Sequence, residues 1–368
     1  MKSTPAFNYF RHSLFMRKIL LLPFSVLFAF AVGIRNFFFD QKINRSIEFD
    51  IPIIGVGNLA IGGQGKTPLT EYILVLVKNT FKTGVLSRGY KRKTKGFKQV
   101  ELNSTAEECG DEPMQMKNKY KEVFHCVCED RAIGIPLMLA ENPLDVILLD
   151  DAFQHRWVKP GLNILLSDFN APFFNDSILP GGNLRETRNG YRRADVIIFT
   201  KCISYPEESI RKNYLNTISK IDGSKVFFSG LEYGNLIHFF SPEKKQKQVS
   251  DFKNILLVCG IAKPKYISDY LKEQGIKLHS LLFNDHHEFT DNDLKNIVST
   301  FEKLNDENAI IITTEKDAMR LLKFKEKSSL LQDRLFTLPI KIKFQPEEKN
   351  RFDKIIFDFI EAKSPHNN

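Results

Sequence analysis

A glycine-rich stretch of the chain ends in the residue types that hold the phosphates of a nucleotide. Residues 62–67 read G-G-Q-G-K-T. Small residues let backbone N–H groups converge on phosphate oxygens, a lysine adds a mobile positive charge, and a hydroxyl binds magnesium. The sequence therefore predicts a phosphate-binding loop with these nucleotide-binding residues: Gly62, Gly63, Gln64, Gly65, Lys66, Thr67 and Pro68.

The loop departs from the usual pattern G-x-x-x-x-G-K-[ST] at one position, because Ala60 stands where the first glycine is expected. A methyl group is tolerable at the start of the loop if the backbone angles there are ordinary. The apolar run 51–56 predicts a strand before the loop, and residues 69–77 predict a helix after it. The alternative interpretation is a glycine-rich turn that only caps a helix.

Paired aspartates end another predicted strand. Residues 145–151 read D-V-I-L-L-D-D, and a carboxylate in this position holds Mg²⁺ in nucleotide-binding proteins, directly or through water. Asp150 and Asp151 are therefore candidate metal ligands, together with the hydroxyl of Thr67. Thr200 and Lys201 follow a further predicted strand, 196–199, where such proteins read the base, so they are added to the nucleotide-binding candidates.

Transfer of a phosphoryl group also needs a base or positioning group for the acceptor hydroxyl. Residues 109–113 read C-G-D-E-P and present two adjacent carboxylates, and residues 285–288 read D-H-H-E. Neighbouring histidines on one strand point to opposite faces, which favours a carboxylate–histidine pair over a metal site. The loop 179–186, L-P-G-G-N-L-R-E, adds one cation and one anion.

The first forty residues contain an uncharged stretch, 19–34, with basic residues on both sides. Its sixteen residues are short for a full membrane span, which needs about 20. A secretory signal and a core helix are alternatives, but a membrane-embedded or interfacial helix fits best. The sequence leaves open whether this helix spans the bilayer or enters one leaflet.

The rest of the chain alternates short apolar runs with amphipathic stretches, as βαβ units do. The predicted fold class is α/β, a P-loop NTPase-like sheet that is mainly parallel and flanked by helices. We expect three parts, with a two-stranded connector between the last two: a membrane-associated helix at 1–40, a nucleotide-binding core at 41–230 and a smaller α/β subdomain at 231–368.

The composition indicates which kinds of partner and which cellular compartment suit the chain. A formal charge of +9 suits an acidic partner such as a nucleotide or an anionic lipid. The five cysteines include no C-x-x-C pair, which indicates a reducing compartment without a disulfide framework or zinc site.

Taken together, these segments resemble the tetraacyldisaccharide 4′-kinase family of lipid A biosynthesis. The matching motifs run in the family's order along nearly the whole chain: G-N-L-A-I-G-G-Q-G-K-T-P (57–68), S-R-G-Y (87–90), G-D-E-P (110–113), L-D-D-A-F-Q-H-R (149–156), L-P-G-G-N-L-R-E (179–186), T-K (200–201), D-H-H-E-F (285–289) and T-E-K-D-A (314–318). One departure is Gly182-Asn183, where the family's loop is expected to contain more proline.

The resemblance implies an ATP- and Mg²⁺-dependent lipid kinase that phosphorylates the 4′-hydroxyl of tetraacyldisaccharide 1-phosphate. It implies an inner-membrane enzyme whose catalytic part faces the cytoplasm, with no nucleic acid partner. By this resemblance Asp111 is the base, His286 assists it and Lys66 neutralises developing charge. The metal candidates become Thr67, Glu112, Asp150 and Asp151; the substrate candidates are Arg88, Tyr90, Asn183, Arg185 and Glu186. His155 is expected to support the site from behind, one helical turn past Asp151.

Two rival functions stay open at this point. A membrane-associated P-loop NTPase that switches conformation would use the phosphate loop but leaves G-D-E-P and D-H-H without a role. A non-enzymatic nucleotide-binding membrane module is the second rival. In the predicted division of the chain, Asp111 lies in the larger part and His286 in the smaller one, so the two parts are expected to close around ATP.

Overall fold

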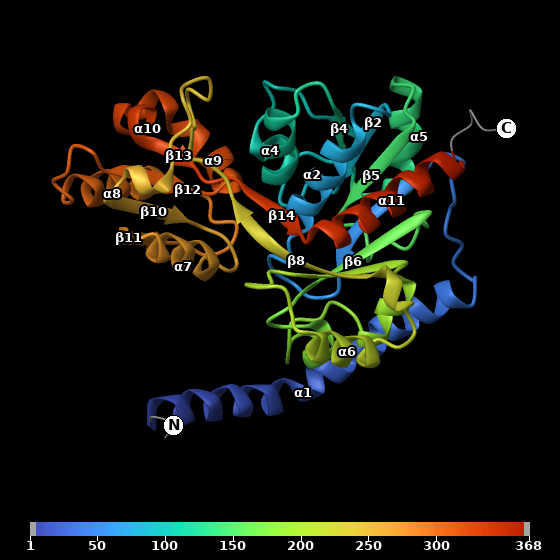
Figure 1. The fold of residues 1–368 in the computed structure, drawn as a ribbon. Coiled ribbons are helices and arrows are strands. Elements are labelled where there is room, and N and C mark those ends of the chain that lie inside the picture. Colours follow the sequence, from blue (N-terminus) through green and yellow to red (C-terminus); the bar gives the residue numbers. More distant parts are fainter. Residues whose placement is uncertain (1–4, 364–368) are drawn as a thin grey trace. The chain divides into compact units, whose positions relative to one another are not determined.

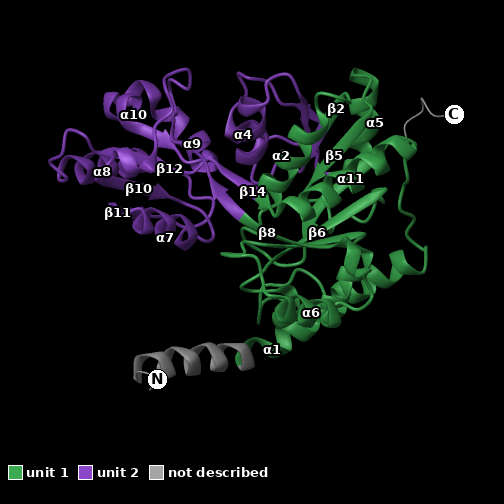
Figure 2. Ribbon diagram, viewed as in Figure 1, with its two compact units in different colours: residues 1–84, 130–230, 343–368 green, residues 85–129, 231–342 purple. Residues whose placement is uncertain are grey.

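The chain forms two compact units, each built from separate stretches of sequence (Figure 2). The structure, a computed structural model, describes the backbone of residues 5–363 and the side chains of residues 20–363. Unit 1 comprises residues 1–84, 130–230 and 343–368, and unit 2 comprises residues 85–129 and 231–342. Residues 85–129, which we expected in the nucleotide-binding core, thus group with the C-terminal part of the chain.

A parallel sheet forms the centre of unit 1, as predicted. Its strand order is β8-β7-β6-β1-β5, and each neighbouring pair is parallel. The core strands read as nearly continuous apolar runs because both faces of the sheet are buried. The strands are β1 (Ile53–Asn58), β5 (Val146–Asp150), β6 (Leu162–Asp168), β7 (Val196–Thr200) and β8 (Val226–Tyr233). The chain passes from unit 1 to unit 2 within β2 (Thr83–Ser87).

Within residues 5–363, unit 1 also contains α-helices from each of its three stretches of sequence (Figure 1). They are α1 (Pro5–Asp40), α2 (Lys66–Val77), α5 (Arg131–Glu141), α6 (Glu208–Thr217) and α11 (Pro346–Lys363), and the unit also contains the 3₁₀ turns η1 (Phe173–Asn175), η2 (Arg188–Arg193) and η3 (Gly223–Lys225). Sequence analysis missed α11, although Phe352, Ile356 and Ile360 recur at the spacing of one buried helix face. Its Asp353 accepts a 2.6 Å hydrogen bond from Tyr72 of α2.

Unit 2 contains a five-stranded sheet in the order β11-β10-β12-β13-β9. Its strands are β9 (Ile237–His238), β10 (Asn254–Cys259), β11 (Lys277–Leu282), β12 (Ile310–Thr313) and β13 (Leu335–Thr337). The other elements of this unit are β3 (Lys98–Gln99), β4 (Phe124–Val127), α3 (Ala106–Cys109), α4 (Asp111–Lys119), α7 (Lys265–Glu273), α8 (Asp291–Glu302), α9 (Glu315–Leu321) and α10 (Ser329–Arg334), with the 3₁₀ turns η4 (Val249–Asp251) and η5 (Leu322–Lys327). Helix α4 packs on α9, so residues from 111–119 and 315–321 meet within one unit.

Two expectations from the sequence are wrong: one strand over residues 335–342, and pairing of residues 235–240 with the strand that begins at residue 225. The predicted strand 335–342 is two strands, β13 and β14 (Ile340–Phe344), because Pro339 between them has no N–H to continue a ladder. The predicted pairing of residues 235–240 with β8 does not form, since β9 instead pairs antiparallel with β13. The hydrogen-bonded neighbour of β8 on its outer side is β14.

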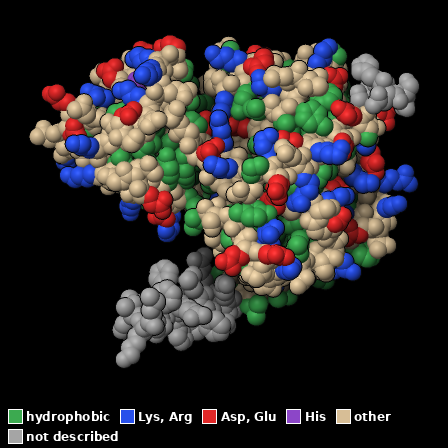
Figure 3. Space-filling view, in the orientation of Figure 1, with side chains coloured by type: hydrophobic (Ala, Val, Ile, Leu, Met, Phe, Trp, Pro, Cys, Tyr) green, Lys and Arg blue, Asp and Glu red, His purple; other side chains and the backbone are tan. Residues whose placement is uncertain are grey.

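Helix α1 contains the long apolar stretch predicted from sequence. By length and composition, Leu20–Asp40 is able to cross a membrane, with a mean hydropathy of 1.8 and only 6% of the window buried. Its large exposed apolar side chains are Leu20, Leu22, Phe24, Val26, Leu27, Phe30, Ile34, Phe37 and Phe38. Elsewhere on the face shown in Figure 3, basic and acidic side chains are interspersed, so the net positive charge is not gathered in one patch there.

The tight packing of Gly57 in β1 gives a test of the fold. A Cβ at this position would lie 2.5 Å from Phe153 Cβ and 2.8 Å from the Phe153 backbone nitrogen. We expect Gly57→Ala to lower the free energy of unfolding by about 1–3 kcal/mol, because the backbone must shift to admit the methyl group. Urea denaturation followed by circular dichroism measures the effect.

Gly223→Ala is the matched control, since the nearest atom to its added Cβ would be 3.6 Å away. We expect a change within about 0.5 kcal/mol for this variant. Equal stability of the two variants would contradict the close approach between β1 and the segment at Phe153.

Candidate active site

The phosphate loop of unit 1 connects β1 to α2 with a left-handed backbone at two glycines. Gly62 has φ of 89° and Gly65 has φ of 92°, angles that favour residues without a Cβ. Ala60 is not among the residues with positive φ. It forms an antiparallel bridge with Leu184, so its backbone is extended and its methyl group causes no strain. The missing glycine is therefore compatible with the loop.

A compact ionic cluster lies beside this loop. The Lys66 Nζ atom is 3.3 Å from Asn58 Oδ1 and 3.7 Å from Asp151 Oδ1. Arg185 Nη2 lies 2.9 Å from the same Asp151 oxygen and also donates to Asn58 Oδ1. Burial would raise the pKa of Asp151, but the charges of Lys66 and Arg185 outweigh it and hold that pKa well below its usual value. Asp151 is thus a carboxylate at neutral pH.

The two aspartates at the end of β5 have different surroundings. Asp150 is buried and accepts a 3.3 Å hydrogen bond from Thr70 Oγ1 on α2. The Asp151 side chain keeps 33% of its surface exposed and lies in the Lys66 cluster. Asp151 is therefore better placed than Asp150 to meet a ligand of the phosphate loop. Among residues 20–363, no three acidic, histidine or cysteine side chains form a ready-made metal cluster.

Thr200 and Lys201 lie beneath the phosphate loop and hold its backbone. Thr200 Oγ1 donates to the carbonyl of Gln64 at 2.9 Å, and Lys201 Nζ donates to the carbonyl of Gly63. The Lys201 ammonium group also pairs with Asp168 Oδ2 at 3.2 Å. These contacts are buried or partly buried, so in this structure the threonine–lysine pair supports the loop. Asp168, the last residue of β6, was not among the predicted site residues.

Unit 2 brings Asp111 and His286 together, although they are 175 residues apart. Asp111 begins α4, and its Oδ2 lies 3.3 Å from His286 Nδ1. Arg320 Nε lies 2.9 Å from the same oxygen, and the ring of Tyr90 meets the His286 ring edge-on with centroids 4.9 Å apart. We expected Asp111 and His286 in different parts of the chain, but both belong to unit 2.

The other nitrogen of His286 faces a lysine, and this contact fixes the tautomer. Lys316 Nζ lies 3.1 Å from His286 Nε2 and 3.0 Å from Glu112 Oε1. Burial would lower the pKa of Lys316, but Glu112, Asp285 and Asp111 raise it above its usual value. Because an ammonium group only donates, Nε2 must accept and Nδ1 must carry the proton. His286 therefore donates from Nδ1 to the Asp111 carboxylate.

Glu112 and His287 have partners other than the Asp111 carboxylate. Glu112, expected as a metal ligand, accepts from Lys316 within unit 2. His287 Nε2 lies 3.0 Å from Asp293 Oδ2, and its ring stacks on Phe283. The neighbouring histidines therefore have separate partners, and they lie in a turn after β11 and not on a strand.

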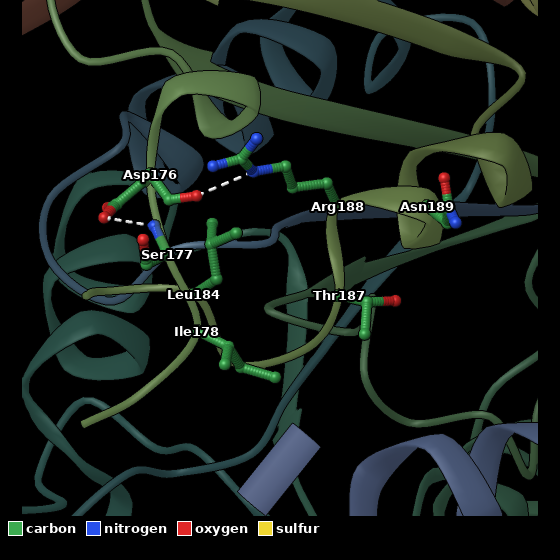
Figure 4. A pocket seen from close by; sticks show the side chains of 7 residues that line it. All are labelled: Asp176, Ser177, Ile178, Leu184, Thr187, Arg188 and Asn189. Carbon is green, nitrogen blue, oxygen red and sulfur yellow. Dashed lines mark hydrogen bonds between the residues drawn. The ribbon is translucent and has the colours of Figure 1, made fainter. Parts of the chain in front are cut away.

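The candidate substrate residues occupy several places. Arg88 and Tyr90 of unit 2 are exposed. Asn183 donates to Asp176 Oδ2 at 2.9 Å, and Asp176 lines a cavity of about 430 Å³ in unit 1 (Figure 4). That cavity is lined by Asp176, Ser177, Ile178, Leu184, Thr187, Arg188 and Asn189. Of the candidates, only Arg185 lies in the Lys66 cluster.

Glu186 and His155 are both set back from the phosphate loop. Glu186 is 2% exposed and is bonded by neighbouring side chains. His155 Nε2 accepts from the backbone N–H of Arg131 at 3.3 Å, and burial together with Arg131 lowers its pKa to about 4. Arg131 in turn donates to the carbonyl of Asp151 at 3.1 Å. His155 thus supports Asp151 indirectly, but through a turn and not along a helix as expected.

Comparisons with known proteins agree with the motifs. The family model described as tetraacyldisaccharide-1-P 4′-kinase matches residues 17–359. The tetraacyldisaccharide 4′-kinase of Parabacteroides distasonis is 42% identical over 350 residues, which cover 94% of this chain and 95% of that protein. The corresponding protein of Flavobacterium psychrophilum is 42% identical over 351 residues, covering 95% and 98%.

A solved structure gives the same result for the fold. LpxK from Aquifex aeolicus, crystallised in complex with ATP, is 30% identical with a TM-score of 0.70, over 93% of this chain and 99% of that chain. The predicted P-loop-type α/β fold is therefore confirmed. With a family match across nearly its whole length and relatives at this level of identity, the chain belongs to the tetraacyldisaccharide-1-P 4′-kinase family.

Proposed function

We propose that this chain transfers the γ-phosphate of MgATP to the 4′-hydroxyl of tetraacyldisaccharide 1-phosphate, and that it does so at a membrane surface. Membership of the family makes the chain a kinase of lipid A biosynthesis. The observation that carries the assignment of residues is the Asp111–His286 contact. A base beside the acceptor is needed for transfer to a hydroxyl, and a nucleotide switch has no use for it.

The nucleotide end of the reaction is assigned to unit 1. The left-handed glycines direct backbone N–H groups toward the phosphates, and Lys66 balances the charge that develops on the departing ADP. Thr67 and Asp151 fit Mg²⁺, because this ion prefers oxygen ligands and takes only a few of them from a protein. Thr67 offers a hydroxyl, and Asp151 offers an ionised, partly exposed carboxylate. The ion would neutralise phosphate charge when bound. Thr200 and Lys201 support the loop from below.

The acceptor end is assigned to Asp111. As the 4′-oxygen forms its bond to the γ-phosphorus, the bond to ADP breaks and the hydroxyl proton passes to the Asp111 carboxylate. The Nδ1–H group of His286 orients that carboxylate, and Arg320 stabilises its charge. Arg88, Tyr90, Asn183 and Arg185 are proposed to bind substrate phosphates or sugar. Glu186 has a different role, argued below.

Helix α1 is proposed to hold the enzyme on the cytoplasmic face of the inner membrane, where ATP and the acylated substrate are both available. Its exposed apolar side chains form a surface that water does not stabilise. A lipid substrate explains why a kinase would carry such a helix.

The proposed transfer is tested with γ-labelled ATP and the acylated disaccharide 1-phosphate. We expect label in the lipid product, and Lys66→Ala should lower this transfer at least about 100-fold because the developing charge loses its cation. Thin-layer chromatography of the lipid fraction measures the label, and circular dichroism shows whether the variant is folded.

Lys220→Ala, which changes an exposed lysine of unit 1, is the control and should match the unaltered protein. Label released as inorganic phosphate with none in the lipid would favour the nucleotide switch. Full transfer by Lys66→Ala would remove the phosphate loop from the mechanism.

Asp111→Asn tests the proposed base. The amide keeps the shape of the side chain but accepts no proton, so we expect kcat to fall about 100- to 10,000-fold while KM for ATP changes less than about threefold. Steady-state kinetics at varied ATP separates the two parameters.

Asp293→Asn alters the aspartate–histidine pair at His287 in unit 2, and should leave kcat within about twofold. A loss in Asp111→Asn that is confined to ATP binding would argue against a base, as would equal losses in both variants.

The membrane role of α1 is tested by charging its exposed face. Leu27 and Phe30 are 67% and 66% exposed, so Leu27→Asp combined with Phe30→Asp should move the protein from sedimented vesicles to the supernatant. These changes spare Arg35, Asn36 and Phe39, which contact the body of unit 1. Ile203→Asp, at a residue 94% exposed elsewhere in unit 1, is the control; unchanged sedimentation of the double variant would place the attachment elsewhere.

A further inference from the structure

Glu186 joins helix α1 to the loop 179–186. Its carboxylate accepts hydrogen bonds from Asn36 Nδ2 at 3.1 Å, Gln154 Nε2 at 3.0 Å and Arg193 Nη2 at 2.8 Å. Only 2% of the residue is exposed. A buried carboxylate with three donors is held in one orientation, since loss of any donor leaves charge poorly compensated. Glu186 therefore fixes the position of α1 relative to neighbouring segments of unit 1.

Gln154 continues this connection to the phosphate loop. The same Nε2 group that donates to Glu186 also donates to the carbonyl of Asn58 at 2.8 Å. Asn58 is fully buried at the end of β1, and its side-chain oxygen accepts from Lys66 and Arg185. A continuous set of hydrogen bonds thus runs Asn36–Glu186–Gln154–Asn58–Lys66.

Backbone pairing makes this set rigid. Arg185 N donates to the Leu59 carbonyl at 2.8 Å, and Ile61 N donates to the Asn183 carbonyl at 2.8 Å. The loop is therefore bonded along the residues that lead into the phosphate loop. Successive side chains on this paired segment diverge, so Arg185 reaches Asp151 while Glu186 reaches Asn36.

We propose that Asn36, Glu186 and Gln154 are positioning residues, through which the docking of α1 sets the place of Asn58 and hence of the Lys66 ammonium group. The segment that meets the membrane is then coupled to the group that balances charge in the reaction. We call the hydrogen-bonded series Asn36–Glu186–Gln154–Asn58–Lys66 the relay. The inference rests on the proposed phosphoryl transfer, because it assigns the relay an effect on that step. None of the three side chains touches a reacting atom.

A double-mutant cycle tests the relay with Asn36→Ala and Gln154→Met. Each variant removes one link, so each should lower kcat by about three- to tenfold, the effect of one hydrogen bond, while KM for the lipid changes less than about twofold. The double variant should be no slower than the slower single variant, because a relay already broken loses nothing more. Labelled lipid product measures kcat, and thermal unfolding confirms that each variant folds.

Ser25→Ala is the matched control. Ser25 Oγ accepts from Gly181 N at 2.9 Å, so this change also removes a bond between α1 and the same loop but leaves the relay intact. We expect kcat within about twofold of the unaltered protein. If Gln154→Met does not fold, Glu186→Asp takes its place in the cycle.

If the fold-loss of kcat in the double variant equals the product of the two single losses, the relay is overturned. A loss of kcat in Ser25→Ala as large as that in Asn36→Ala would also overturn it. Failure of the unaltered protein to label the lipid would instead defeat the proposed function. The two failures are therefore distinguishable in one set of assays.

Discussion

The ion pair of Asp151 with Lys66 and Arg185 organises the nucleotide side of this protein. One carboxylate oxygen faces both cations, and Asn58 holds the same two cations from the other side. Like charges would separate if left alone, so this shared carboxylate keeps Lys66 and Arg185 close to the glycine turn. Backbone hydrogen bonds between residues 59–61 and residues 183–185 also hold Arg185 beside the phosphate loop.

A comparable arrangement organises the acceptor side. Arg320, Asp111, His286, Lys316 and Glu112 alternate in donor and acceptor character within unit 2. Each inner member of this series lies between two complementary neighbours, which determines the histidine tautomer and keeps the pKa of Lys316 raised. A connected network of this kind holds the Asp111 carboxylate and the His286 ring in a fixed orientation.

Structural features that depend on local sequence patterns could be predicted. Strands β1 and β7 of unit 1 are apolar runs, and their observed limits lie within two residues of the expected 51–56 and 196–199. The phosphate loop was also predictable, because its glycines, lysine and threonine are consecutive. Helix α11 was not predicted, although its buried apolar residues recur at helical spacing.

The partners of charged side chains could not be predicted in the same way. Glu186 is three residues from Asn183 in sequence, yet its contacts come from residues 36, 154 and 193. Thr200 and Lys201 were expected to meet the base, but whether a polar group after a strand faces a ligand or the loop beneath it depends on tertiary packing. The break between β13 and β14 could be predicted from Pro339. That β13 and β14 belong to different sheets could not be predicted from the sequence.

The discontinuity of unit 1 has a consequence for synthesis on the ribosome. Helix α11 contacts α2, and the bond between Tyr72 and Asp353 joins residues 281 positions apart. A nascent chain that has emerged as far as residue 342 contains every strand of the unit 2 sheet, but the phosphate-binding unit still lacks its last helix. Until residues 346–363 have emerged, α2 is not covered by α11, so a translation pause before that point would prolong the exposure of α2 to chaperones and proteases.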